Sequence, residues 1–411
     1  PARPTTERRT PRPTRTRRDV RRTPGRNTVI NVFQPSLGEA ELAAVAEVFA
    51  SNWLGSGPRT RAFEEQFADH LGVDADQLLF TNSCTAGLFL AAELLELGPG
   101  DEVVMPSVSF VAAANAVAAT GARPVFCDVD PRSLNPTAEH IEQALTDRTR
   151  AVVVLHFGGD PGEVAAIARL CRARGVPLVE DAACAVASTV DGRRCGTFGD
   201  IAVWSFDAMK VMATGDGGML HVRDPELARR ARVLAYHGLA RPSGYASARV
   251  SSRWWELDVT DFGRRVLGND LTAAIGTVQL RRLPEFVERR SAVAAAYDTL
   301  LADAEGVRLP PRPAAGRTSS HYFYWVQLDP AVRDRVAATL LERDIYTTFR
   351  YPPLHRVPAY GTDHPELPGT DAAAESTLLL PLHQALTDEE VATVARELRA
   401  AVAHHAAPAR V

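Results

Sequence analysis

The stretch WSFDAMKVMATGDGGML, residues 204–220, contains Lys210, the only lysine of this 411-residue chain. Lysine and arginine together number 46, so every other cation of this kind is an arginine. Arginine stays protonated in proteins, whereas a lysine amine can lose its proton and act as a nucleophile. A lysine retained by chance would explain the count equally well, so the neighbouring sequence has to decide. If the amine is used chemically, we expect it to form a Schiff base with a carbonyl group.

The residues around this lysine are of the kinds that a phosphate-bearing aldehyde requires. Ser205 lies five residues before Lys210, and the glycine-rich residues 215–218 allow the backbone to fold back tightly. Asp181 follows an apolar strand predicted at 177–180, so we expect its carboxylate at the C-terminal edge of a sheet. An aspartate after a strand is also a common helix N-cap, which is the alternative interpretation.

A second polar segment, TNSCTAGL at residues 81–88, follows a strand predicted at 77–80 and opens a helix. The free N–H groups of a helix start attract an anion, and here they belong to Cys84, Thr85 and Ala86. Small polar residues before a helix are more often plain caps, so this segment alone indicates little.

The combination of these segments is more specific than any one of them. Pyridoxal phosphate (PLP) needs a lysine for its aldehyde, an acid for its pyridine nitrogen, a phosphate site and an aromatic face. Candidates for all four occur in chain order: Thr85, Phe110, Asp181, and Ser205 with Lys210.

The hydrophobic pattern predicts an α/β protein. Strands are expected at residues 77–80, 102–105, 124–128, 151–156 and 177–180, with helices at 37–51, 61–71, 84–97, 111–120, 137–145 and 163–174. Apolar strands between helices indicate a parallel sheet covered on both faces. We predict a large domain at 28–282 and a smaller α+β domain at 283–411, with helices at 285–302, 331–343 and 388–403. An aromatic strand at 321–328 is interpreted as core.

Composition excludes several classes of protein. The net charge of -4 argues against nucleic-acid binding, and no run of 18 apolar residues indicates a membrane span. Residues 1–27 hold ten arginines and five prolines without apolar periodicity, so they are predicted to be disordered. The five cysteines lack metal-site spacing and indicate reduced thiols in a cytoplasmic protein without a structural metal.

Over residues 29–403 the sequence resembles the DegT/DnrJ/EryC1/StrS family of PLP-dependent, fold-type I sugar aminotransferases. The segments that carry the resemblance are VPLVEDAACAVASTVDGRRCGTFGDIAVWSFDAMKVMATGDGGML (176–220), PGDEVVMPSVSFVAAANAV (99–117), FGRRVLGNDLTAAIGTVQL (262–280) and FRYPPLHRVPAY (349–360). The resemblance implies a mainly parallel seven-stranded sheet, a homodimer with shared active sites, Lys210 as the Schiff-base lysine and Phe110 stacked on the PLP ring.

Four positions depart from the pattern of the family. Val186 stands where relatives commonly have His. Cys184 stands where relatives have Gln or His near the phenolic oxygen of PLP. Arg265 aligns with a residue, often Asn or Lys, that reaches the cofactor phosphate of the neighbouring subunit. Arg350 stands where relatives often have His. With Trp53, Tyr351 and His355, Arg350 completes the candidate substrate residues.

The resemblance implies transfer of an amino group from glutamate to a keto-deoxysugar carried by a nucleotide. Lys210 would then act as the base, which requires its pKa to be lowered from about 10.4 by burial and imine formation. A keto-cyclitol or aminobenzoate precursor as acceptor would use the same residues and stays open. A PLP-dependent dehydratase would have His in place of the lysine. A non-catalytic regulator that binds PLP or a nucleotide sugar is the alternative from another class, although it would have no chemical need for an amine.

Overall fold

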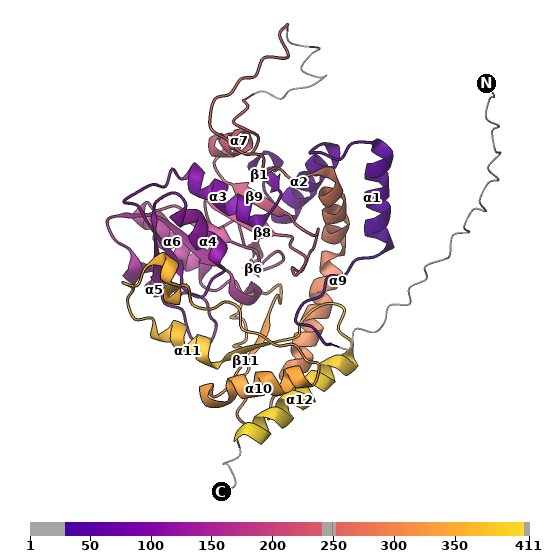
Figure 1. Ribbon diagram of the computed structural model, residues 1–411, viewed down its shortest axis with the longest axis vertical. Helices are drawn as coiled ribbons and strands as arrows, with labels where there is room; N and C mark the ends of the chain where they lie inside the picture. The colour runs from indigo at the N-terminus through magenta and orange to yellow at the C-terminus, as the bar shows by residue number, and fades with distance from the viewer. Residues whose placement is uncertain (1–28, 241–248, 250–251, 407–411) are drawn as a thin grey trace, which may run out of the picture.

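A central seven-stranded sheet organises the protein. Figure 1 shows the protein as a computed structural model. The structure describes residues 29–240, 249 and 252–406. The strand order is β1-β9-β8-β5-β4-β2-β3. The strands are β1 (Leu78–Thr81), β2 (Glu102–Pro106), β3 (Arg123–Cys127), β4 (Thr149–Leu155), β5 (Leu178–Asp181), β8 (Ile201–Ser205) and β9 (Gly218–Val222). Only β9 runs antiparallel to its neighbours, β1 and β8, which confirms the predicted mainly parallel sheet.

Helices cover both faces of this sheet because its strands carry apolar side chains on both sides. They are α2 (Pro58–Leu71), α3 (Cys84–Leu94), α4 (Val111–Ala118), α5 (Ala138–Ala144), α6 (Val164–Arg174) and α7 (Pro225–Leu234). Helix α1 (Glu39–Ser51) packs instead on the long helix that begins at Asp270. Val103, Val153 and Val203 pack in one buried cluster with α3 and α4. On the other face, Val104 and Val152 pack with α5 and α6, and Trp204 packs with α2. Alternate residues of a strand therefore belong to different cores, as the pleat requires.

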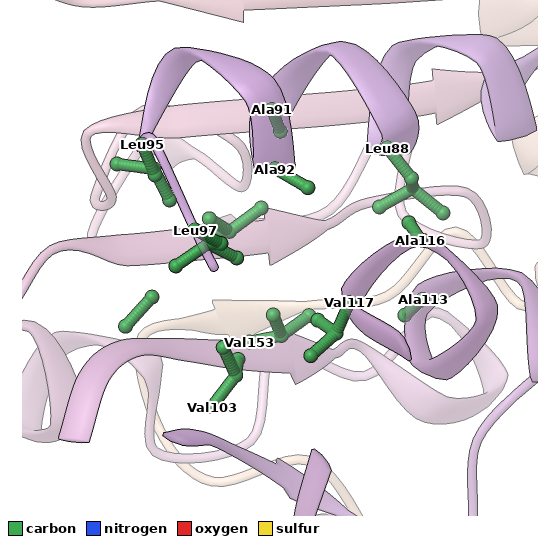
Figure 2. Close-up of a pocket in the computed structure, with 12 residues that line it drawn as sticks. Leu88, Ala91, Ala92, Leu95, Leu97, Val103, Ala113, Ala116, Val117 and Val153 are labelled. Atoms are coloured by element: carbon green, nitrogen blue, oxygen red, sulfur yellow. The ribbon is translucent and has the colours of Figure 1, made fainter. Parts of the chain in front are cut away.

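Figure 2 shows a small void in the core between α3, α4 and the sheet, into which Leu88, Ala92, Ala113 and Val103 point. Its volume is about 20 Å³, which is space for about one water molecule. Its lining is wholly apolar, so the void is a packing defect rather than a ligand site.

The C-terminal part forms a second layer around a two-stranded sheet. Its elements are α9 (Asp270–Leu300), β11 (Tyr324–Gln327), α10 (Pro330–Glu342), α11 (Pro368–Ser376), β12 (Thr377–Leu380) and α12 (Asp388–Ala406). In Figure 1, α10, α11, α12 and β11 lie together, and α9 runs from the side of α1 and α2 to α12. The helix predicted to begin at Glu285 begins at Asp270, with Pro284 inside it. The prediction was wrong there because it started the helix after Pro284, whereas the helix continues through this proline.

A three-stranded sheet of β6 (Thr189–Val190), β7 (Arg193–Arg194) and β10 (Arg317–Thr318) links the two parts. The proposed division at residue 282 falls inside α9, and the domain ranges stay a prediction. The predicted disordered tail, residues 1–27, lies outside the described residues. None of the described helices is long and apolar enough to cross a membrane.

The sheet brings three polar segments to one edge. β1, β5 and β8 all point the same way, so their C-terminal ends meet there. The end of β1 leads into α3, the end of β5 carries Asp181, and the end of β8 carries Ser205 and leads to Lys210. Sites of open α/β sheets form at such strand ends.

Candidate active site

A cavity of about 270 Å³ opens at this edge of the sheet. This volume is close to the lower end of the range of roughly 300–1,000 Å³ that is usual for small-molecule sites. The cavity brings together most of the residues predicted from the sequence: Cys84, Thr85, Phe110, Asp181, Ser205, Lys210, Arg350 and Tyr351. Leu88, Ala112 and Leu155 provide apolar walls, and Asp207 and Asp216 add carboxylates.

Lys210 lies at the centre of a cluster of weak acids. Its Nζ is 3.9 Å from Sγ of Cys184 and 4.4 Å from the centre of the Tyr322 ring. Burial lowers the pKa of Lys210, but Cys184, Tyr322, Tyr351 and Asp181 together raise it well above its ordinary value. The lowering expected from the sequence concerns the protein with an aldehyde bound and stays a prediction; in the protein alone the surrounding acids outweigh burial. In this state the side chain is an ammonium.

Asp181 is the last residue of β5 and is almost completely buried. Its Oδ1 accepts a hydrogen bond of 3.1 Å from the N–H of Ala183. Burial raises the pKa of Asp181, while this N–H, Lys210 and His156 lower it, and the net shift is upward. A carboxylate with a raised pKa accepts a hydrogen bond from a ring N–H strongly, because the ion pair forms away from water.

The start of α3 provides an anion site beside Lys210. Ser83 caps the helix by accepting a hydrogen bond of 3.1 Å from the N–H of Ala86. The N–H groups of Cys84 and Thr85 have no hydrogen-bond partner among the described residues, and both residues line the cavity. Ala86 was predicted to bind the cofactor through its amide, but the cap occupies that N–H. An anion here therefore meets two free amides, the helix dipole and the Ser205 hydroxyl.

The close approach of β9 to this helix start depends on Gly218. A Cβ atom on Gly218 would lie 2.5 Å from the backbone nitrogen of Cys84, which no side chain tolerates. The glycine-rich segment after Lys210 therefore lets the strand pass directly behind the anion site.

Aromatic side chains form the opposite walls. Phe110, the residue before α4, is 47 % exposed, and its ring centre lies 5.4 Å from that of Tyr351. Tyr322 lies just before β11 and is buried against Phe33 and Phe323. Tyr322 belongs to the core, as interpreted for residues 321–326, but it also lines the cavity, which the sequence did not indicate. Because Tyr322 is brought to Lys210 only by the packing of the C-terminal part on the sheet, no local sequence signal marks it.

Several predicted residues lie outside the cavity of this chain. Arg265 is exposed, with its guanidinium 5.4 Å from the Tyr236 ring centre. Trp53 is 56 % exposed, and its Nε1 donates to the Ser56 carbonyl. His355 is held by Ser107, with 2.7 Å between Nδ1 and Oγ, and its Nε2 lies 3.4 Å from Asp371.

Two further histidines and a tryptophan pair that the sequence makes conspicuous are accounted for structurally. His156 is buried with Nε2 3.0 Å from Oε2 of Glu180. His237 adopts a left-handed backbone conformation before Gly238. Trp254 and Trp255 are exposed and pack on each other, with ring centres 4.8 Å apart. None of these residues lines the described cavity at Lys210.

The residues at this edge fit the group that PLP would place there. An amine, a buried carboxylate, two free amides with a hydroxyl, and an exposed aromatic ring line one cavity. The described residues contain no cluster of three or more His, Cys, Asp or Glu side chains that could hold a metal ion. The arrangement therefore fits an organic aldehyde phosphate, and the cofactor role of each residue stays a prediction.

Comparison with known proteins assigns the chain. A model of the DegT/DnrJ/EryC1/StrS aminotransferase family matches residues 35–399. The chain is 62 % identical over 377 residues to a dTDP-4-dehydro-2,3,6-trideoxy-D-glucose 4-aminotransferase of Saccharopolyspora spinosa, covering 92 % of this chain and 98 % of that protein.

Solved structures agree with this match. The aminotransferase TlmJ from Streptoalloteichus hindustanus is 63 % identical, with a TM-score of 0.88, over 92 % of this chain and 99 % of that chain. The protein Spr1654 from Streptococcus pneumoniae, solved in its PMP form, is 25 % identical, with a TM-score of 0.85, over 91 % of this chain and 99 % of that one. The family predicted from the sequence and its fold are thereby confirmed.

Proposed function

Because the chain belongs to the DegT/DnrJ/EryC1/StrS aminotransferase family, we propose that it uses PLP to move an amino group from glutamate to a dTDP-linked 4-keto-deoxysugar. The observation that carries this proposal is the placement of the only lysine and the buried Asp181 in one cavity beside a helix start. A regulator without catalysis would not need this amine. The relative from Saccharopolyspora spinosa, 62 % identical, favours a nucleotide sugar over a keto-cyclitol or aminobenzoate acceptor.

Each side chain has a separate task in this proposal. PLP, when bound, supplies an aldehyde for covalent attachment and a ring that accepts electrons. Lys210 Nζ holds the aldehyde carbon and, once displaced by an incoming amine, moves a proton. Asp181 holds the proton of the ring nitrogen. The amides of Cys84 and Thr85, with Ser205, bind the phosphate, and Phe110 covers the ring.

The state of Lys210 changes between these tasks. As an ammonium among Cys184, Tyr322 and Tyr351 it is neither nucleophile nor base. The ammonium would have to give a proton to solvent before its nitrogen could hold an aldehyde carbon, and the amine that a donor later displaces would be neutral and able to accept a proton. Tyr322 and Tyr351, both buried at the cavity, exclude water from this transfer.

The active unit in this proposal is a homodimer with shared sites in a natural-product pathway of the cytoplasm. Large apolar side chains are exposed on α1 and on the segment after residue 252, including Leu42, Phe49, Trp255 and Phe262, the last 99 % exposed. A groove of about 470 Å³, lined by Ser56, Tyr236 and Leu239 among others, adjoins Arg265, whose partner across the isolated β-bridge is Tyr236. Exposed apolar surface of this extent is typical of an interface.

The absorption spectrum of purified protein tests the proposal. Wild type loaded with PLP should show a visible band that disappears on addition of glutamate and returns on addition of the dTDP-4-keto sugar. Lys210→Ala should lack the band of the covalently held cofactor. Lys210→Arg is the matched control, since it keeps the positive charge and removes only the nucleophile. A wild-type spectrum that glutamate leaves unchanged would exclude glutamate as the donor.

A further inference from the structure

Building on the proposed function, we infer that Arg350 binds the carboxylate of the amino donor that lies next to the reacting amine. Arg350 lines the cavity of Lys210 and is half-buried. Among the described residues it forms no ion pair, although Asp207 and Asp216 line the same cavity. An arginine at the mouth of a cavity with its charge uncompensated is a built site for an anion.

The neighbours of Arg350 orient it without occupying its donors. The guanidinium carbon lies 5.0 Å from the centre of the Phe33 ring, and NH2 lies 3.6 Å from Sδ of Met209. A thioether is a weak acceptor, and an aromatic face offers none of the oxygen atoms that a guanidinium pairs with best. The planar fork is therefore held in place while most of its five N–H donors stay free for a planar, two-oxygen ligand.

The position of this charge favours a carboxylate of the donor over the diphosphate of the sugar nucleotide. Arg350 and Lys210 line one cavity of about 270 Å³, so an anion bound to the guanidinium inside this cavity lies near the reacting amine. In an amino acid, the α-carboxylate sits on the carbon that bears the amine. In a 4-keto sugar nucleotide, the diphosphate is attached across the sugar ring from the ketone.

Binding of two ligands to the PLP-loaded protein, measured by calorimetry, tests the assignment. 2-Oxoglutarate carries the carboxylates of glutamate without an amine, so it binds this form without reacting. Thymidine diphosphate represents the acceptor. Arg350→Gln should weaken the binding of 2-oxoglutarate by roughly 10- to 100-fold and the binding of thymidine diphosphate by less than about 3-fold. Arg350→Lys, which keeps the charge but loses the fork, should lie between wild type and Arg350→Gln.

Controls separate this inference from the proposed function. Arg335→Gln removes the same charge from the exposed face of α10 and should leave both affinities unchanged. Failure of the proposed function appears in wild type, as a spectrum that glutamate does not alter. The inference fails if wild type and Arg350→Gln bind 2-oxoglutarate with equal affinity. It also fails if neither protein binds 2-oxoglutarate. A larger loss for thymidine diphosphate than for 2-oxoglutarate would place Arg350 at the acceptor and overturn it as well.

Discussion

Two buried charges of opposite sign, Lys210 and Asp181, set the chemistry of the cavity at the residue scale. Burial alone would neutralise both, since it lowers the pKa of a lysine and raises that of an aspartate. The acids near Lys210 reverse its shift, whereas Asp181 keeps a raised pKa. The site therefore holds an amine nitrogen that would carry an incoming aldehyde and a buried carboxylate that would keep the proton on an incoming ring nitrogen.

Asp181→Asn separates binding from catalysis. The amide keeps the shape of the carboxylate but cannot stabilise a positive ring nitrogen, so the ring loses most of its capacity to accept electrons. We expect near-normal PLP content and a first half-reaction with glutamate that is slower by roughly 100- to 1,000-fold, measured by stopped-flow absorbance. Asp334→Asn on the exposed face of α10 is the charge-matched control. Unchanged half-reaction rates in Asp181→Asn would remove Asp181 from the mechanism.

Cys184 should behave as an inert thiol. Burial raises its pKa to about 11, against the opposing influence of Lys210. At pH 7 only about one molecule in 10,000 then carries the reactive thiolate. Iodoacetamide at neutral pH should leave Cys184 unmodified in the native protein and modify it after denaturation, as measured by mass spectrometry of peptides. Native modification as fast as that of the denatured control would contradict the raised pKa.

The sequence predicts the residues of the site where the segments are short and local. Ser205 and Lys210 lie five residues apart, and Asp181 ends an apolar run. This spacing was enough to predict that all three lie at one edge of the sheet. Tyr322 escaped prediction because its place depends on how the C-terminal part packs on the sheet. The amide of Ala86 was predicted to bind the cofactor because a helix cap and an anion site look alike in sequence. Only the hydrogen bond from this amide to Ser83 shows that it belongs to the cap.

At the scale of elements, the contact between β9 and the start of α3 makes the anion site possible. Gly218→Ala should push the strand from the helix, since the new Cβ would meet the Cys84 backbone at 2.5 Å. We expect a loss of about 1–3 kcal/mol in stability and weaker PLP binding, measured by thermal unfolding and by fluorescence titration. Gly98→Ala is the control, because nothing lies within 4 Å of its Cβ position. Equal losses in both variants would contradict the role of this contact.

A buried carboxylate at the start of β2 should make the free energy of unfolding fall at acid pH. Glu102 is almost fully buried and bonds to Arg123 at 2.9 Å and to Arg148 through Nε at 3.0 Å. Burial raises the pKa of Glu102, but the hydrogen bonds to Thr146 and the two arginines lower it by more than this. The net result is a pKa of about 2. This carboxylate therefore stabilises the fold above about pH 4.5, and the contribution is lost as the pH falls towards 2.

Glu102→Gln tests this dependence. It should reduce the free energy of unfolding by about 2 kcal/mol near neutral pH. The difference from wild type should shrink as the pH falls from about 4.5 towards 2. Urea unfolding over this range measures it, with the exposed Glu342→Gln on α10 as control. A difference that does not change with pH would show that the shape of the side chain matters rather than its charge.

The elements themselves were predicted best where periodicity is strong. α6 and α12 begin within one residue of their predicted starts, because amphipathic spacing and an acidic first residue mark them. The start of α9 was missed because a proline inside a helix usually indicates an end, whereas here the turns before Pro284 are stabilised by packing on α1 and α2.

For the whole molecule, the position of Arg265 bears on the proposal that each active site is shared between two subunits. Its guanidinium lies on the half-buried Tyr236 ring, away from the cavity that contains Lys210 of the same chain. The exposed Phe262 and the groove beside Ser56 and Tyr236 occupy the same side of the protein as this arginine. If Arg265 completes the phosphate site of the partner subunit, every active site needs residues from two chains.

Mixing two inactive variants decides this point. Lys210→Ala and Arg265→Ala should each be nearly inactive alone. After dissociation and reassociation together, half of the dimers contain one subunit of each kind. In such a dimer one site carries both defects and the other carries neither, so activity should recover to about a quarter of the wild-type value. Aminotransferase assays on the mixture, with dimer exchange followed by mass spectrometry, measure this recovery. Full exchange without recovery would show that Arg265 acts on its own chain, and an active Arg265→Ala variant would show that it has no role.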